Sequence, residues 1–384
     1  MNRLASRAVK PGVETLRALC DRARPNSFGF LRYLLSALVV YSHCFPTGGL
    51  GREPLVIWTL HQERLGTLAV KSFFVLSGFL VTHSYVQSGS ALRYLWNRVL
   101  RIFPGFWVML LAVAFGFAWL NYHHLTGRFG GFFAGFGGGS WDYVKQNWLL
   151  SIERQSINGL PINIPFPVTF NGSLWSLVYE FRCYLGLAIL GLLGGLTRFG
   201  RIGTCIVFAV MAAYVVNRLL DPQALAGSRV FWRDQHMVDL APWFCAGALL
   251  YLFSERIPSH WGLFAVALGI TLATLHYGYF VIAGPLTLGY CLLHLALRLP
   301  LSSWDRKGDF SYGVYIYSFP IQQTLAGWNV QKYGVVLFFC AALTLATLLG
   351  ALSWFAIEKP ALSLKRLWPT EGLFVRLRRA LNSL

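Results

Sequence analysis

Residues 26–46, NSFGFLRYLLSALVVYSHCFP, are an apolar stretch with one arginine near its start and one histidine near its end. A helix of this length can span a bilayer. The eleven steps from Arg32 to His43 cover roughly 16 Å and about three turns, so both side chains share one helical face. With Arg32 at one membrane surface, His43 lies within the hydrocarbon region, where an ionisable side chain indicates function. A histidine that only hydrogen-bonds helices together is the alternative.

The composition also favours a membrane protein. Of the 384 residues, 55% are hydrophobic and 12% charged, whereas soluble proteins carry about 25% charged residues. The net charge of +18 would suit nucleic acid, but long uncharged segments with 30 Phe and 14 Trp indicate lipid instead, and we expect no nucleic-acid partner. The seven cysteines are scattered without CxxC spacing, so we expect neither a disulfide framework nor a metal site.

Hydropathy and chain breaks predict an all-α, polytopic membrane protein with about ten transmembrane helices. We expect a basic cytoplasmic tail over residues 1–25, a transmembrane domain over 26–365 and a second basic cytoplasmic tail over 366–384. The predicted spans are 29–46, 69–86, 101–120, 173–195, 203–219, 238–254, 261–276, 279–297, 310–328 and 333–357.

The distribution of Lys and Arg predicts the orientation of these spans. If the N-terminus is cytoplasmic, 21 of the 33 basic residues fall on cytoplasmic segments and 10 on external ones, while Arg32 and Arg182 lie within spans. Cytoplasmic loops of membrane proteins are enriched in Lys and Arg. We therefore expect both termini in the cytoplasm and His43 in the outer half of the membrane.

The one long external connection is 121–172. It contains GRFGGFFAGFGGG at 127–139 and PINIPFP at 161–167. Glycine makes such a segment flexible, and aromatic side chains, here including Trp141 and Trp148, offer flat faces of the kind that sugars stack on. A loop of this length is usually functional or disordered. An apolar loop lying on the bilayer surface is the alternative.

A second motif, FFVLSGF at 73–79, leads through a polar turn to Arg98 and Arg101 at the cytoplasmic entrance of the third span. Residues three apart share one face of a helix, and guanidinium groups fit phosphate oxygens. The two arginines can therefore clamp a phosphorylated ligand that arrives from the cytoplasm. Juxtamembrane arginines that only fix the topology are the alternative.

Two carboxylates complete the set of charged residues in or next to spans. The segment GSLWSLVYEF at 172–181 places Glu180 inside the fourth span, where it needs a partner, and Arg182 and His43 are the candidates. A purely structural salt bridge is the alternative. Glu358 lies in WFAIEKP at 354–360, where the local pattern favours a charge at the membrane interface.

In chain order, the motifs are Arg-x10-His, FFxLSGF, Arg-x-x-Arg, SLWSLxxE, SYGVYIYSFP at 311–320 and a terminal EKP. This order resembles the membrane-bound acyltransferase-3 family over residues 28–365. Each motif alone is weak, whereas six in order with the same topology are specific.

The resemblance implies a ten-span enzyme of the bacterial inner membrane that moves an acyl group, usually acetyl, from cytoplasmic acyl-CoA to a hydroxyl of an extracytoplasmic or lipid-linked carbohydrate. This chain resembles the stand-alone type without a fused SGNH hydrolase-like domain. The expected partners are acyl-CoA, a carbohydrate acceptor, the lipid bilayer and polysaccharide-biosynthesis proteins. The expected site residues are His43 and Glu180 in catalysis, Arg32, Ser77, Arg98 and Arg101 in donor binding, and Glu358, Trp175 and Tyr179 as further candidates.

The chemistry of these residues suits such a reaction. A sugar hydroxyl is a weak nucleophile, and a neutral imidazole can accept its proton during attack on a thioester, without a metal. His43 acts as this base in the favoured interpretation, with Glu180 orienting the ring, and acylation of His43 itself stays open. Lipopolysaccharide, exopolysaccharide and lipid-linked repeat units all fit as acceptors. The main rival function is a transporter or flippase of a lipid-linked sugar, because intramembrane charges also suit a translocation path.

Overall fold

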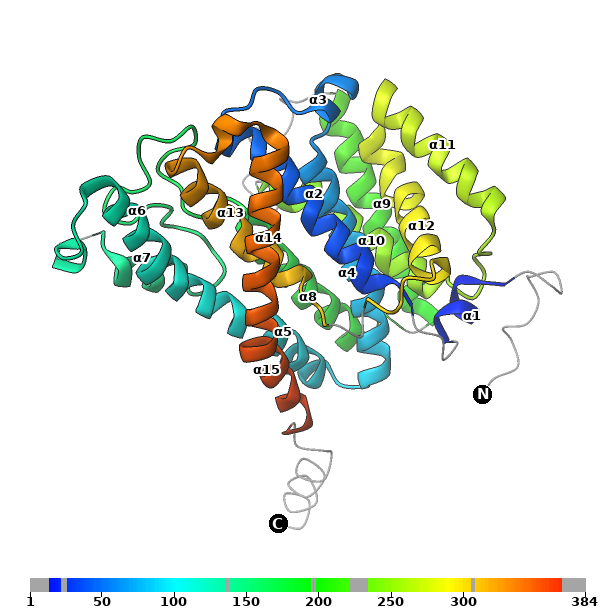
Figure 1. The fold of residues 1–384 in the computed structure, drawn as a ribbon. Coiled ribbons are helices and arrows are strands. Elements are labelled where there is room, and N and C mark those ends of the chain that lie inside the picture. Colours follow the sequence, from blue (N-terminus) through cyan, green and yellow to red (C-terminus); the bar gives the residue numbers. More distant parts are fainter. Residues whose placement is uncertain are drawn as a thin grey trace, which may run out of the picture.

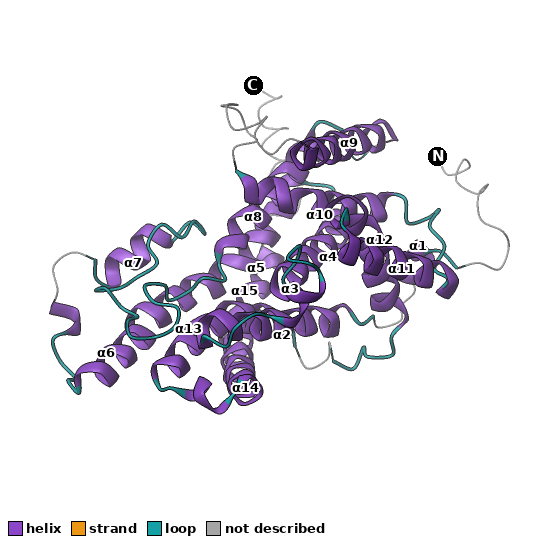
Figure 2. Cartoon of the chain, turned by 90° about the horizontal axis from the view of Figure 1, so that it is seen from above, coloured by secondary structure: helices purple, strands orange, loops and turns teal. Residues whose placement is uncertain are grey.

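The computed structural model describes residues 14–21, 26–134, 138–194, 196, 198–220, 234–304 and 308–367. This part of the chain is helical and contains no strand (Figure 2). The all-α prediction is therefore confirmed for the described residues. Most of the two predicted basic tails, namely 1–13, 22–25 and 368–384, lies outside them.

Each of the ten predicted spans coincides with a helix. The third begins at Ala91 rather than at residue 101, because the Ser90 side chain caps it by accepting a hydrogen bond from the Arg93 amide. The helices are α2 (Phe28–Gly48), α4 (Leu65–Ser88), α5 (Ala91–Leu111), which continues through a π-helical segment (Ala112–Phe117) into α6 (Ala118–Thr126), α8 (Trp175–Leu192), α9 (Arg198–Leu220), α10 (Gln235–Leu252), α11 (Trp261–Tyr277), α12 (Phe280–Arg298), α13 (Ser311–Gly327) and α14 (Val335–Ser353).

The described residues also form four short α-helices: α1 (Leu16–Asp21), α3 (Pro54–Trp58), α7 (Ser140–Asn147) and α15 (Lys359–Ser363). In Figure 1, α1 and α15 lie at the lower end of the helix bundle and α3 lies at the upper end. Seen from above, α6 and α7 project on one side and α11 lies on the other (Figure 2). The bundle thus has two distinct ends, which are called the α15 end and the α3 end below.

The outer surface of the bundle identifies a membrane protein. Among the described residues, six helices are long and apolar enough to cross a bilayer: α2, α4, α5 with its continuation to Thr126, α8, α12 and α14 with its continuation to Arg366. Large apolar side chains are exposed along the outer helices, for example Ile206 on α9, Val266 on α11 and Leu348 on α14. Such a surface fits lipid. The number of ten spans and the orientation of the termini stay predictions.

Helix α13 is the most enclosed element of the bundle. Its residues Ser311–Ala326 are all buried, and it packs against α2, α5, α6 and α14 (Figure 1). Gln322 donates a hydrogen bond to the carbonyl of Val40 on α2 at 2.8 Å. A helix that faces protein on all sides can carry such polar groups, because other helices of the bundle offer hydrogen-bond partners. The polar side chains of α13 are therefore compatible with its central position.

The glycine of the FFVLSGF motif fixes the crossing of α4 and α10. A Cβ atom added at Gly78 would lie 2.0 Å from the carbonyl oxygen of Phe244, and one added at Gly247 would lie 2.0 Å from that of Val75. The two backbones therefore touch at a pair of glycines, as small residues permit in membrane helix pairs. This close approach holds the next residue of the motif, Phe79, fully buried.

The long connection after α6 is held against α13 in its second half. Gln323 donates hydrogen bonds to the carbonyls of Phe166 and Thr169, and Asn171 donates one to the carbonyl of Ile316. Residues 135–137 of the glycine-rich segment lie outside the described part of the chain. Trp141 and Trp148 are mainly exposed, as side chains available for stacking must be.

Candidate active site

Two cavities of about 310 Å³ each lie inside the bundle. We call the first the arginine cavity, since Arg32, Arg98 and Arg101 line it together with Trp354, Leu362 and Lys365 at the α15 end. We call the second the histidine cavity, since His43 lines it together with Arg52, Glu53 and Val56 at the α3 end. Helix α2 thus carries Arg32 into one cavity and His43 into the other.

A chain of ion pairs crosses the arginine cavity. Asp309, in the loop before α13, accepts hydrogen bonds from Arg32 at 2.7 Å and from Arg101 at 2.6 Å. Arg101 also pairs with Glu358 at 3.1 Å. Burial alone would raise the pKa of Asp309, but Arg101 and Arg32 lower it from 3.8 to about 2. Arg32 and Arg101 are therefore already neutralised by carboxylates of the chain.

Glu358 is buried inside the bundle. It is 1% exposed, and besides Arg101 it bonds to the Ser353 hydroxyl at 3.1 Å. The local pattern, which favoured a charge at the membrane interface, could not indicate this ion pair, because the partner Arg101 lies on α5 and is far away in the sequence. Glu358 lies behind Arg101 and acts on the cavity through it.

Arg98 and Lys365 differ from these paired arginines. Neither makes an ion pair with a carboxylate within the described part of the chain, and both line the arginine cavity. The Arg98 guanidinium makes a 3.4 Å hydrogen bond to the Ser84 hydroxyl, while its buried Nε atom has no partner there. The positive charge that the arginine cavity can offer to a bound anion is therefore concentrated on Arg98 and Lys365.

Glu180 lies in the arginine cavity and pairs with hydroxyl groups. It accepts hydrogen bonds from Ser77 at 2.8 Å and from Tyr184 at 2.5 Å. The two partners considered from the sequence are engaged elsewhere: Arg182 pairs with Asp234 at 2.8 Å, and His43 lines the other cavity. Ser77 and Glu180 thus form one hydrogen-bonded unit on facing sides of α4 and α8.

His43 presents an imidazole without hydrogen bonds to the described residues. Its Nδ1 atom is buried and unpartnered, and its ring packs edge to face against Phe319 with centroids 5.2 Å apart. Glu53, buried in the same cavity, is occupied by the Ser42 hydroxyl at 2.6 Å and the Leu65 amide at 2.5 Å. A ring that is fixed by packing and free at its nitrogens is available for proton transfer to a ligand.

The remaining candidates lie on α8. Trp175 lines the histidine cavity, and Tyr179 packs against it with ring centroids 6.1 Å apart. Both rings also contact His236 on α10. Tyr179 is not among the residues that line either cavity, so the structure places it behind Trp175.

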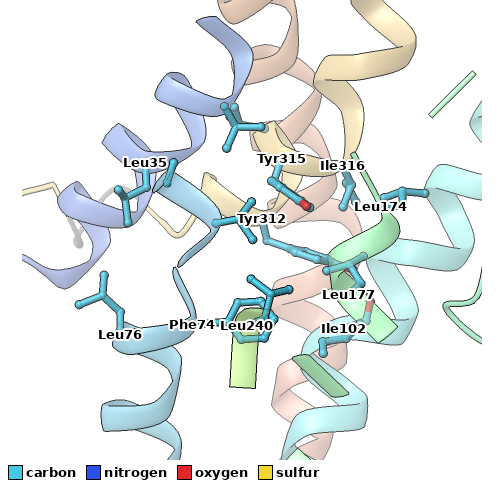
Figure 3. Close-up of a cluster of buried hydrophobic side chains, with 14 of the residues drawn as sticks. Leu35, Phe74, Leu76, Ile102, Leu174, Leu177, Leu240, Tyr312, Tyr315 and Ile316 are labelled. Carbon is cyan, nitrogen blue, oxygen red and sulfur yellow. Dashed lines mark hydrogen bonds between the residues drawn. The ribbon is translucent and has the colours of Figure 1, made fainter. Parts of the chain in front are cut away.

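Two residues, Val70 on α4 and Tyr315 on α13, line both cavities. The Tyr315 hydroxyl donates a hydrogen bond to the Ser173 carbonyl and shares another with the Ser176 hydroxyl at 2.7 Å. Figure 3 shows Tyr315 one turn above Tyr312 on α13, beside Leu174 and Leu177 at the start of α8. We call Val70 and Tyr315 the partition, because they separate the arginine cavity from the histidine cavity.

The sequence profile of the acyltransferase domain family matches residues 26–355, which is most of the chain and includes every residue that lines the two cavities except Leu362 and Lys365. The chain belongs to the acyltransferase-3 family. Both cavities are therefore built mainly from the family's own domain, and Lys365 is added to the arginine cavity from beyond the match.

Two relatives match this family member over most of their own length. An O-acetyl transferase of Shigella phage Sf6 is 25% identical over 341 residues, which cover 88% of this chain and 96% of the relative. Nodulation protein 10 of Rhizobium leguminosarum bv. viciae is 26% identical over 373 residues, which cover 88% and 94%. No solved structure gives a significant match.

Sequence reasoning missed three residues of the site: Asp309, Tyr315 and Lys365. Tyr315 lies within the SYGVYIYSFP motif and Asp309 two residues before it, so the motif marked the right segment without indicating which side chains face a cavity. Lys365 appeared only as one basic residue in the segment after the last span. Its position over the arginine cavity depends on the turn after α15.

Proposed function

We propose that the chain is an integral-membrane O-acyltransferase that moves an acetyl group from acetyl-CoA, bound at the α15 end, to a hydroxyl of a carbohydrate, bound at the α3 end. The observation that supports this best is the pair of cavities at opposite ends of one bundle. Within the described part of the chain, one cavity holds cations without a carboxylate partner, the other holds an unpartnered histidine, and they share only Val70 and Tyr315. Membership of the acyltransferase-3 family supplies the reaction class.

The arginine cavity suits the donor. Arg98 and Lys365 face the phosphates of CoA at the α15 end, since these two cations have no carboxylate partner among the described residues. Arg32 and Arg101 hold the cavity open through Asp309 and Glu358. A volume of about 310 Å³ is at the small end for ligand sites and fits the narrow pantetheine arm rather than the nucleotide. The thioester then lies deepest, at the partition.

The histidine cavity suits the acceptor. Trp175 offers an aromatic face to a sugar ring, and the exposed Arg52 and Arg64 line the side that opens at the α3 end. His43 lies on the wall that continues toward Val70 and Tyr315. A sugar hydroxyl that reaches the partition therefore meets both the imidazole and the thioester.

The transfer proceeds as a direct displacement. His43 accepts the proton of the sugar hydroxyl while the hydroxyl oxygen attacks the thioester carbonyl carbon. The tetrahedral species collapses with cleavage of the carbon–sulfur bond, and the His43 imidazolium returns the proton to the departing thiolate. The products are the O-acetylated sugar and CoA with a free thiol, and no metal or redox partner is consumed. Ser77 and Glu180 fix the donor side of the partition through their hydrogen bond.

The orientation of the enzyme follows from the excess of Lys and Arg on the α15 side. That side is cytoplasmic in our proposal, so the donor comes from the cytoplasm of a bacterium and the acceptor is an extracytoplasmic glycan or a lipid-linked precursor. The relative from phage Sf6 carries the name O-acetyl transferase, which supports acetyl as the acyl group and oxygen as its acceptor.

The test is acetyl transfer by the purified protein in nanodiscs. We expect the wild type to release CoA from acetyl-CoA in the presence of an acceptor glycan, and His43→Ala to lose at least a hundredfold in rate because the general base is gone. His124→Ala, an exposed histidine on α6, is the matched control and should keep full activity. Equal melting temperatures of the three proteins show that folding is unchanged. Full activity of His43→Ala would contradict the assigned mechanism.

A further inference from the structure

We infer that the partition residues Val70 and Tyr315 set the size of the acyl group that the enzyme transfers. This inference rests on the proposed function and adds to it a position at which donors of different acyl length are told apart. It starts from the observation that these two side chains line both the arginine cavity and the histidine cavity.

Both partition residues are firmly held. Val70 is 6% exposed and Tyr315 is 7% exposed. The Tyr315 hydroxyl is tied to Ser173 and Ser176, and its ring lies edge to face against Phe73 with centroids 6.3 Å apart. Two independent helices, α4 and α13, therefore hold the side chains that stand between the two cavities. A packed wall of this kind does not yield to an added methylene without strain.

The proposed reaction requires the acyl group to lie at the partition. The carbonyl carbon of the thioester must come within reach of a hydroxyl that His43 deprotonates, so it must lie where the two cavities meet. The alkyl chain beyond the carbonyl then extends against the side chains that line both cavities. An acetyl group adds one methyl there, whereas a butyryl group adds two further methylenes. Val70 lines both cavities there, so its side chain competes with those methylenes for space.

The expected size of the effect follows from known pockets. One methylene in a fitted apolar pocket changes kcat/KM by roughly 10- to 200-fold. We therefore expect Val70→Ala to raise the ratio of kcat/KM for butyryl-CoA to that for acetyl-CoA by at least about tenfold. Val70→Ile should lower the ratio of kcat/KM for propionyl-CoA to that for acetyl-CoA, because the added methylene takes up space at the partition. Because the two substitutions shift the preference for longer acyl groups in opposite directions, a general loss of folding cannot be the cause.

A matched control lies on the same helix. Val81 is also a buried valine of α4 and lines the arginine cavity, but it does not line the histidine cavity. Val81→Ala makes the same chemical change away from the partition and should leave the acyl-length ratio within about twofold. For the tyrosine, Tyr315→Phe removes the two hydrogen bonds that hold the ring and should raise the butyryl ratio, while Tyr312→Phe on the arginine-cavity side should not.

The experiment measures kcat/KM with acetyl-, propionyl- and butyryl-CoA in nanodiscs for the wild type and the five variants. The binding constants of the same three thioesters are measured in the His43→Ala background without acceptor, where turnover is at least a hundredfold slower than in the wild type. Support requires that Val70→Ala shifts both the kinetic ratio and the binding ratio toward butyryl and that Val81→Ala does not. If the wild type transfers acetyl but Val70→Ala leaves both ratios unchanged, this inference alone is overturned. A wild type that transfers no acyl group would overturn the proposed function and this inference with it.

Discussion

Replacing Asp309 by asparagine removes the carboxylate that joins Arg32 to Arg101. The folded chain lowers the pKa of this acid from 3.8 to about 2, and its side chain is 23% exposed. At about 1.36 kcal/mol per pH unit, the ionised carboxylate stabilises the fold at neutral pH by about 2 kcal/mol. Asp309→Asn should lose at least this amount, because it leaves Arg32 without an acid partner among the described residues.

The assay is thermal unfolding of the detergent-solubilised protein at a series of pH values. An acid whose pKa is lowered by folding stabilises the protein when it is ionised. The difference in melting temperature between wild type and Asp309→Asn should therefore be complete above about pH 4 and should shrink as the pH falls toward 2. We expect a difference of a few degrees at pH 7.

The matched control is Asp21→Asn. Asp21 also pairs with an arginine, Arg17, but its side chain is 52% exposed, and exposed pairs contribute little. The melting temperature of Asp21→Asn should match that of the wild type. If Asp309→Asn unfolds at the wild-type temperature at pH 7, or if the difference persists unchanged at pH 2, the ion-pair network does not stabilise the arginine cavity as described.

The remaining predictions concern helix packing and donor binding. Gly78→Ala places a methyl group 2.0 Å from the Phe244 carbonyl oxygen and should reduce the yield of folded protein on size-exclusion chromatography, whereas Gly186→Ala on α8, with open space around it, should not. Lys365→Met should weaken CoA binding, measured by calorimetry in nanodiscs, by roughly tenfold and reduce its salt dependence, because one of the two unpaired cations is lost. Arg93→Gln, an exposed change on α5, should bind CoA as the wild type does, and equal weakening by both changes would refute a specific role for Lys365.

The helices of this protein could be predicted from the sequence because lipid imposes a strong and local rule. A long apolar run must form a helix in the bilayer, and all ten predicted spans coincide with helices. Helix periodicity predicted that Arg98 and Arg101 share one helical face, and both line the arginine cavity. Arg32 and His43 lie on one helix, as the apolar stretch around them predicted. These statements depend on spacing within one segment only.

The partners of the charged residues could not be predicted, because they come from distant segments. Arg32 and Asp309 are separated by 277 positions, and Arg101 and Glu358 by 257. Glu180 was expected to pair with a charged residue, yet it accepts hydrogen bonds from Ser77 and Tyr184. Which side chains meet depends on the rotation of each helix about its axis, and in a bundle with apolar residues on every face hydropathy leaves that rotation undefined.

The meeting of the two cavities at Val70 and Tyr315 has a consequence for divergence within the family. The arginine cavity and the histidine cavity draw on otherwise separate residues. Substitutions around Trp175 and Arg64 can therefore accumulate without disturbing the residues around Arg98. If the proposed function holds, a lineage can exchange one acceptor for another while it inherits the arginine cavity unchanged. Two relatives about one quarter identical carry different names, O-acetyl transferase and Nodulation protein 10.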